Sequence, residues 1–488
     1  MSDKEGFKSL LYAARFTVLA RMGGRLALLL AWLCLPPLLV ALWFAEYAYL
    51  PTFAAVILLL LLLAWLSRRL PDPRQFMRSE GFVLTSAAFV LTPLLMTLAL
   101  WPSGLEWQDL ILETVSAVTT TGLSTLQSVA EADRTFLFTR AWMQWYGGLG
   151  IVVLSVVFLM PRTVAAYQLL EVPEGQDMVL TVKVYARRIL HIYLLLTLVA
   201  ILVCWLCFGD LFNGLLHGLS AISTGGFSSR DDSLAGLAFS GQLGVMLMGM
   251  SGAVSLAIYL RIQQRAWHAI GQNQELRLFL WLTLLVCAVL VWLELAGPSS
   301  GQPGDWRHGV ILGLSALSTT GFSNTEVASL GEAGKLVLIF AMFLGGCLGS
   351  TAGGCKMFRL LLLWRLLLTS LRRTCAAPHA VIEPRLQGKV LNQEQLQQAM
   401  LSIGLLAVLC LPSWLAFLCY GYEPLDALFE VVSAVGTVGL STGITASQLP
   451  WLLKAVLCVD MIAGRLEVLA LLCLFYPGVW LGRRYALD

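Results

Sequence analysis

The sequence predicts an all-α membrane protein made of four similar units, each a span, a short helix and a second span, behind an N-terminal two-helix hairpin. Of its 488 residues, 58% are apolar and 12% are charged, about half the charged fraction of soluble domains. Ten apolar runs reach or approach the roughly 20 residues that cross a bilayer. A nine-residue pattern also returns four times, each time after an apolar segment too short to cross.

The repeated pattern reads S-A-[VIL]-x-T-x-G-[LF]-S and occupies residues 116–124, 220–228, 315–323 and 433–441. Its copies start 104, 95 and 118 residues apart (220−116, 315−220, 433−315). Every copy holds a Thr and a Gly at fixed offsets. The central residues of the four copies are Thr120, Thr121 and Gly122; Thr224, Gly225 and Gly226; Thr319, Thr320 and Gly321; and Thr437, Val438 and Gly439.

Four such loops about one axis suit a cation-selective filter. Backbone carbonyls can replace the water of a cation, and Gly gives the backbone the positive φ that turns carbonyls inward. The alternative is simple helix packing, because Ser, Ala, Thr and Gly are common where membrane helices touch. Packing residues usually recur inside full-length spans, whereas these copies follow half-length segments. The repeats therefore predict a pseudo-tetrameric cation pore on one chain.

The elements follow in order along the chain. The hairpin comes first, and each unit then places a short pore helix between its two spans. The pore helices should begin near Glu106, Asp210, Asp305 and Glu423, since negative charge is favoured at a helix N-terminus. The predicted boundaries are 1–70 for the hairpin, 71–165 for unit one, 183–262 for unit two, 274–375 for unit three, whose last helix is broken, and 395–488 for unit four.

A glycine-rich stretch interrupts the second span of unit three. Five Gly within residues 345–354 each cost a helix about 1 kcal/mol relative to Ala, so we expect an unwound loop inside the membrane. Such backbone survives only against protein or water, which suits a gate at the inner mouth of the pore. The alternative is a crossing point where two helices touch. The candidate gate residues are Gly345, Gly346, Gly349, Ser350, Thr351, Gly353, Gly354, Lys356 and Arg465.

Arg465 belongs to that set because a guanidinium inside a span normally faces a cavity or a partner. Glu467 lies two residues further along the helix, on a different side, so the two side chains do not face each other. We expect Arg465 to face the glycine loop, with an ion pair to another unit as the alternative. Glu113 and Glu430 lie three residues before the filter Ser in units one and four. Two roles remain open for these acids: they could support the filter by hydrogen bonds, or they could attract cations.

The distribution of basic residues predicts the orientation. Most Lys and Arg fall in the connections that lie on the cytoplasmic side if the N-terminus does, which predicts both termini inside. Cys204 and Cys207 form C-x-x-C in mid-span with no second pair, and buried apolar packing is the default for them. The net charge of +3 does not indicate nucleic-acid binding.

Taken together, these motifs resemble the Trk-type superfamily of bacterial potassium-uptake channels and transporters, which includes TrkH, TrkG and KtrB. The resemblance extends to 144–150, 345–354 and 464–467, and covers the whole chain. It implies potassium as the transported ion, a homodimer in the bacterial inner membrane, and a gate at the broken helix. It also implies a TrkA-like cytoplasmic ring that binds ATP, ADP or NAD. All four filter Gly are kept, which in this family implies a preference for potassium over sodium.

Two other function classes were weighed. An ion-coupled potassium symporter with alternating access stays open, because broken helices and repeats also build secondary transporters. An enzyme is not expected, since the five His are dispersed with no nucleophile–base or metal-ligand cluster. No nucleotide-binding glycine fingerprint occurs, so we expect no organic cofactor on this chain.

Overall fold

The structure, a computed structural model, describes residues 13–72, 77–159, 178–296, 305–377, 379, 382–386, 389–466 and 468–481. The prediction of an all-α fold is confirmed: the only strands in these ranges are the two-residue β1 (Arg385–Leu386) and β2 (Lys389–Val390), which pair antiparallel. Glu467, which the sequence analysis set aside as a partner for Arg465, lies outside the described residues.

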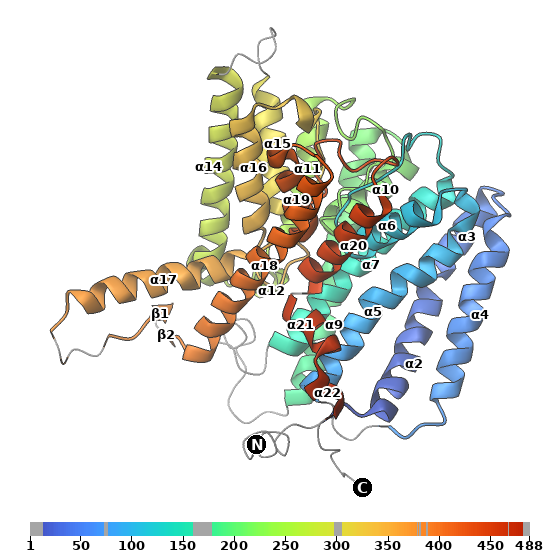
Figure 1. Ribbon diagram of the computed structural model, residues 1–488, viewed down its shortest axis with the longest axis horizontal. Coiled ribbons are helices and arrows are strands. Elements are labelled where there is room, and N and C mark those ends of the chain that lie inside the picture. The colour runs from blue at the N-terminus through green and yellow to red at the C-terminus, as the bar shows by residue number, and fades with distance from the viewer. Residues whose placement is uncertain are drawn as a thin grey trace.

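The N-terminal hairpin consists of α2 (Phe16–Leu33), α3 (Leu35–Trp43) and α4 (Tyr49–Ser67). It stands at one side of the bundle, beside α5 (Figure 1). The α4 helix is apolar over its whole length, and several of its Leu side chains are exposed, Leu58 by 66%. An outward apolar surface is expected of a helix in contact with lipid, where exposing Leu carries no penalty.

The four units share one order of elements. Unit one holds α5 (Arg78–Ala99), α6 (Trp107–Val118) and α7 (Arg134–Leu159), with the 3₁₀ turn η1 (Trp101–Ser103). Unit two holds α9 (Met178–Phe208), α10 (Leu211–Ile222), α11 (Phe239–Ala253), α12 (Leu256–Gln263) and α13 (Trp267–Gly271). Unit three holds α14 (Gln274–Ala296), α15 (Trp306–Ser318), the turn η2 (Val327–Ser329), α16 (Glu332–Leu344) and α17 (Met357–Thr374). Unit four holds α18 (Gln393–Cys419), α19 (Pro424–Val435), α20 (Trp451–Leu466), α21 (Val468–Phe475) and α22 (Pro477–Leu481).

The short helices α6, α10, α15 and α19 occupy the positions predicted for the pore helices, and they keep that name below. Their N-caps are Glu106, Asp210, Asp305 and Glu423, the residues predicted from sequence. The Asp210 carboxylate accepts a hydrogen bond from the Asn213 N–H (3.0 Å), and the Asp305 carboxylate accepts one from the Arg307 N–H (3.0 Å). These bonds satisfy amides that a helix N-terminus otherwise leaves unpaired.

The units close into a ring. The second helix of each unit packs against the pore helix of the next: α7 on α10, α11 on α15, α16 on α19, and α20 back on α6. Every pore helix is thus held between the two long helices of its own unit and one helix of the preceding unit. This cyclic order places the four nine-residue loops around one axis.

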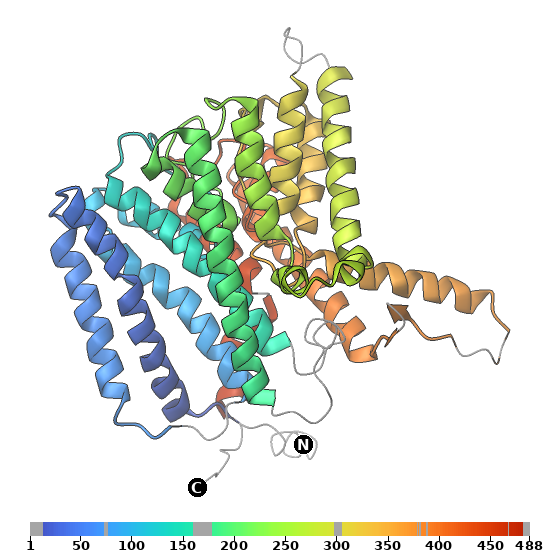
Figure 2. The same cartoon turned by 180° about the vertical axis from the view of Figure 1, so that it is seen from behind.

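One of the ten predicted spans needs correction. The apolar run 242–260, expected from the sequence as one span, is two helices, α11 and α12, that meet at 92°. The second span of unit three is interrupted by residues 345–356, as the glycine-rich stretch predicts, and α17 projects sideways from the bundle (Figures 1 and 2). Within the described residues, six helices are long and apolar enough to cross a membrane alone, and the bent pair makes a seventh. Hydropathy averages over a bend such as that between α11 and α12 and cannot register it.

Candidate functional site

The four repeated loops share one backbone conformation. The Thr that follows each pore helix has a positive φ: 54° at Thr120, 53° at Thr224, 54° at Thr319 and 49° at Thr437. The Gly two residues later also has a positive φ, which is 94°, 78°, 81° and 93° in units one to four. A β-branched residue in this region is a strained outlier. Its recurrence at one position in four units marks the loops as a functional backbone rather than ordinary turns.

The four loops also touch one another in a closed cycle. A side chain added at the filter Gly of any unit would collide with a backbone carbonyl of the next unit. Gly122 faces the Gly225 carbonyl, Gly226 that of Thr320, Gly321 that of Val438, and Gly439 that of Thr121. Each Gly is therefore required twice, by its φ and by the approach of the neighbouring strand. The cycle brings the backbones of the four loops together around one axis, as a filter built of backbone carbonyls requires.

Hydroxyl groups support the loops from behind. The Ser116 side chain accepts a hydrogen bond from the Gly122 N–H (3.0 Å), and the Ser433 side chain accepts one from the Gly439 N–H (3.1 Å). Two further hydroxyl pairs stiffen units one and three, Thr119 with Thr121 (2.8 Å) and Ser318 with Thr320 (2.6 Å).

Unit two is supported differently, by a side chain from unit one. The Gln144 amide on α7 donates to the Gly225 carbonyl (2.5 Å) and accepts from the Ser220 hydroxyl (2.8 Å). A side chain at Gly225 would overlap the amide of Gln144. The φ of Gly225 is not positive, so the backbone does not demand glycine there. Glycine is needed there because the Gln144 side chain occupies the space that a side chain at 225 would fill.

The next interface reverses this arrangement. Gln144 on α7 and Gly249 on α11 lie at equivalent positions. Each comes three residues before a Gly, at 147 and 252, that packs against the last carbonyl of its unit's pore helix. A side chain at Gly249 would overlap the Thr320 side chain. One interface therefore pairs Gln on the helix with Gly in the filter, and the next pairs Gly on the helix with Thr. In both, one side chain fills the same space.

The outer ends of the loops are held by the groups that precede them in the pore helices. Buried Glu113 accepts from the Ser124 hydroxyl (2.6 Å) and the Thr125 N–H (2.8 Å). Glu430 likewise accepts from the Ser441 hydroxyl (2.5 Å) and from 442 and 445. Of the two roles left open for these acids, support of the loop by hydrogen bonds is therefore the one that the geometry supplies.

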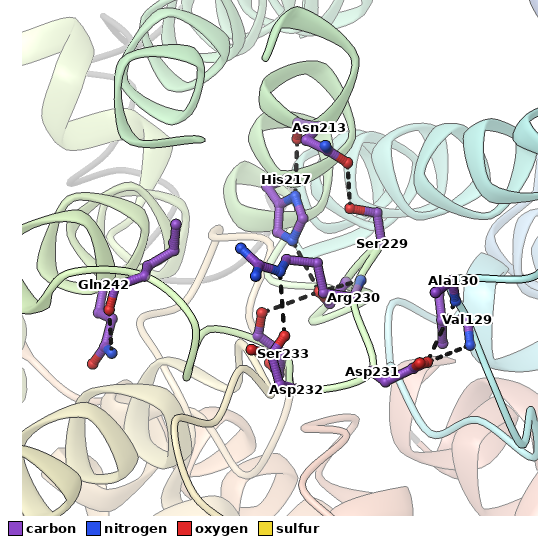
Figure 3. Close-up of polar contacts among 12 residues, drawn as sticks. Val129, Ala130, Asn213, His217, Ser229, Arg230, Asp231, Asp232, Ser233 and Gln242 are labelled. Atoms are coloured by element: carbon purple, nitrogen blue, oxygen red, sulfur yellow. Dashed lines mark hydrogen bonds and ion pairs between the residues drawn. The ribbon is translucent and has the colours of Figure 1, made fainter. Parts of the chain in front are cut away.

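In unit two His217 takes the place of these acids. One ring nitrogen lies 3.0 Å from the Ser228 hydroxyl and the other 2.9 Å from the Asn213 carbonyl (Figure 3). The adjoining outer loop also reaches unit one, because the Asp231 carboxylate accepts from the Val129 N–H (2.5 Å; Figure 3). Neighbouring units are thus tied on the outer face as well as at the filter.

Three cations buried among the helices complete the support. Arg140 on α7 pairs with Glu113 (3.1 Å), and its guanidinium lies 3.7 Å from the centre of the Phe227 ring in the next unit's loop. Lys454 on α20 pairs with Asp109 of unit one (2.5 Å). Lys335 on α16 pairs in the same way with Asp426 of unit four (2.7 Å). Two of the four interfaces between units thus contain an ion pair at the N-terminus of a pore helix, buried for Lys454 with Asp109 and partly buried for Lys335 with Asp426.

The glycine-rich loop, residues 345–356, lies against the pore-helix ends. The Thr351 N–H and hydroxyl both donate to the Gly252 carbonyl (3.1 and 2.9 Å), and the hydroxyl also lies 3.0 Å from the Ile222 carbonyl. The Gly353 N–H donates to the Thr319 hydroxyl (2.8 Å). A side chain at Gly353 would strike Thr437. The loop therefore contacts the inner ends of units two, three and four.

Arg465 holds the loop from the other side, since its guanidinium donates to the Thr351 carbonyl (2.7 Å) and is 3% exposed. Three of the loop glycines have positive φ, 70° at Gly345, 72° at Gly349 and 71° at Gly354, and Lys356 does as well, at 73°. The Lys356 ammonium donates to the Ala352 carbonyl. Gly346 and Ser350 complete the turn, with the Ser350 hydroxyl donating to the Cys347 carbonyl (2.6 Å).

Sequence reasoning missed several of these groups. Arg140, Lys335 and Lys454 were visible as charges inside apolar runs, which mark buried polar contacts by default, but their partners lie in other units and spacing cannot find them. Gln144 was noted only as the first residue of the 144–150 motif, with no role predicted for it. Among the described residues, no cluster of three or more His, Cys, Asp or Glu could hold a metal ion.

Comparison with known proteins agrees with this geometry. A family model described as TrkH, cation transport protein, matches residues 49–297 and 299–478. The chain is 27% identical to the Trk system potassium uptake protein TrkG of Escherichia coli, over 95% of this chain and 98% of that protein. It is also 27% identical to TrkH of the same organism, over 95% and 99%. The crystal structure of the potassium transporter TrkH from Vibrio parahaemolyticus superposes with a TM-score of 0.84 at 27% identity, covering 96% of this chain and all of that one.

Proposed function

The chain belongs to the TrkH family of cation transport proteins, and we propose that it takes up potassium across the inner membrane of a bacterium. The closed cycle of four Gly–carbonyl contacts carries the proposal, because it holds four loop backbones around one axis, the arrangement that a carbonyl-lined filter needs. The names of its relatives TrkG and TrkH specify potassium. The chain is a multi-pass membrane protein rather than an enzyme, as its family indicates.

In this proposal the twelve central loop residues, three from each unit, form the selectivity filter. Gly122→Ser, Gly226→Ser or Gly321→Ser should lower the potassium-over-sodium flux ratio of the purified chain in liposomes. Each added side chain meets a carbonyl of the next loop and opposes the positive φ. Unchanged ratios in all three correctly inserted variants would remove the filter from these loops.

The glycine loop is the proposed gate. It lies at the inner ends of three units and is pinned by one hydrogen bond from Arg465. The fixed charge of Arg465 also raises the energy of a cation passing the closed constriction. Deleting part of 345–354 should therefore raise potassium flux and weaken control by a partner. Wild-type flux and regulation in a well-inserted deletion variant would place the gate elsewhere.

The same liposome preparation separates a channel from a coupled symporter. Unitary conductance steps in planar bilayers would identify a channel. A saturable potassium flux that requires a second ion would identify the symporter instead.

For orientation, we propose that both ends of the chain face the cytoplasm. Arg21 and Arg25, near the start of α2, both donate to Asp72 beyond the end of α4 (2.7 Å each). These hydrogen bonds and charges hold the pKa of the Asp72 carboxyl below its ordinary value. The basic residues gathered at this end support its cytoplasmic placement by the positive-inside rule.

Two partners complete the proposal. The first is a TrkA-like cytoplasmic ring that binds ATP, ADP or NAD and contacts the basic inner connections, 356–395 among them. The second is another copy of this chain. The projecting helix α17 carries an exposed apolar stripe, Trp364 (56% exposed), Leu367 (50%) and Leu371 (56%), which a second copy could cover. Crosslinking through cysteines placed on that stripe tests the dimer.

A further inference from the structure

The filter Thr of unit three makes a contact that its counterpart in unit one does not. The Thr319 hydroxyl accepts a hydrogen bond from the Gly353 N–H of the glycine loop (2.8 Å). Thr120 has the same φ and is equally buried, but its hydroxyl has no hydrogen-bond partner among the described residues. The same position thus serves the filter alone in unit one, and both the filter and the loop in unit three.

Unit two also attaches to the loop. Its filter residue Thr224 has its hydroxyl 3.4 Å from the Thr351 hydroxyl, which in turn bonds the pore-helix carbonyl of Ile222 (3.0 Å). In unit four, Thr437 lies against Gly353, yet its hydroxyl has no hydrogen-bond partner in the part of the chain that the structure describes. The loop therefore engages the inner hydroxyls of two units and leaves two unengaged.

We infer that Thr319 couples the gate to the inner end of the filter: its hydroxyl anchors the glycine loop when the pore is closed and faces the permeating ion when the loop withdraws. This inference rests on the proposed function. Withdrawal must break the Gly353–Thr319 bond, so any cation that needs the Thr319 oxygen competes with the loop for it. A ligand that binds one of two states better shifts the population toward that state. By this linkage, potassium at the inner end of the filter favours the open gate, and the closed loop weakens potassium binding there.

The test compares two isosteric changes at equivalent positions. Purified full-length chain in liposomes, without any partner, is assayed for potassium and rubidium flux. Thr319→Val leaves the Gly353 N–H unpaired in the closed state, so basal flux should rise about two- to tenfold, the effect of one hydrogen bond. Thr120→Val removes a filter hydroxyl without releasing the loop, so flux should fall. Opposite signs are the signature of the coupling.

A second variant approaches the same contact from the loop. Thr351→Val keeps the filter intact but removes the hydroxyl that bonds unit two, and it should also raise basal flux. If Thr319→Val and Thr120→Val change flux in the same direction, the hydroxyl acts only in the filter and the coupling is overturned. The same conclusion follows if loop deletion raises flux while Thr319→Val and Thr351→Val do not, and the gate proposal then stands alone. If loop deletion also has no effect, the gate proposal itself fails.

Discussion

The space shared by Gln144 and Gly225 predicts a pair of substitutions that are harmful singly and tolerated together. Gln144→Gly removes the donor to the Gly225 carbonyl and the acceptor of the Ser220 hydroxyl. Each buried group left unpaired costs about 1–3 kcal/mol, so the variant should lose about 2–6 kcal/mol before the site relaxes. Gly225→Thr alone forces a side chain onto the Gln144 amide, an overpacking that costs about 1–3 kcal/mol.

The double variant reproduces the combination found at the neighbouring interface, where Gly249 faces Thr320. The threonine then fills the space that the glutamine vacates. We expect the double variant to be more stable than either single one, with an interaction energy of about 1–3 kcal/mol, the size measured for contacting residues. The reciprocal pair, Gly249→Gln with Thr320→Gly, is the matched control and should behave alike.

The assay is the apparent melting temperature of purified protein in one detergent at one scan rate, since membrane proteins of this size commonly unfold irreversibly. Potassium-over-sodium flux ratios in liposomes provide the second readout and should fall in the single variants and recover in the double one. Additive losses, with the double variant worse than both singles, would refute the reasoning: the two residues would not share one space.

The remaining predictions concern single positions. Gly226→Ser should lower the potassium-over-sodium flux ratio through its collision with the next loop, whereas a change in flux at constant ratio would speak against a filter role. Arg465→Ala should raise flux by releasing the loop; wild-type flux with normal insertion would contradict this. Lys454→Met should destabilise the fold by about 3–5 kcal/mol, because it leaves the buried Asp109 carboxylate without its partner. The melting temperature should then fall below that of the wild type, and an unchanged value would mean that Asp109 is solvated. Charge reversal at Arg372 and Arg373 should abolish pull-down of a nucleotide-binding ring, and retained binding would move that surface elsewhere.

Much of the fold was predictable because the chain repeats itself. A pattern of Thr and Gly that returns four times reports four similar units, and apolar run length separates full spans from half-length pore helices. The pore helices were predicted to begin near four acids, and those acids are their N-caps, since helix N-terminal charge is a local property. The breaks were harder. The 92° bend between α11 and α12 falls at Val254 and Ser255, just after Ser251 and Gly252; such small residues permit a kink but do not say that one occurs or at what angle.

The candidate site was predictable in its backbone and much less so in its supports. Positive φ at the filter Gly follows from the residue type, but the same conformation at the preceding Thr does not, because strain at a β-branched residue is imposed by the surroundings. The contacts of Arg140 and Gln144 join segments of different units. Such pairs depend on which helix packs on which, and a single sequence does not report that.

The four units share the backbone of the central loops, while the side chains that support those loops differ from unit to unit. The φ of the filter Thr varies only from 49° to 54°, although the side chains behind the loops range from a hydroxyl pair to Gln144 and to Val438. Selectivity by carbonyls constrains the backbone path, and any set of neighbours that holds this path is sufficient. A four-unit pore on one chain can therefore give each unit a separate task. Unit three can contribute the loop and its Thr319 anchor, and unit four can contribute Arg465, without disturbing the fourfold backbone. A homotetramer could not divide the work in this way, because each substitution would appear in all four subunits.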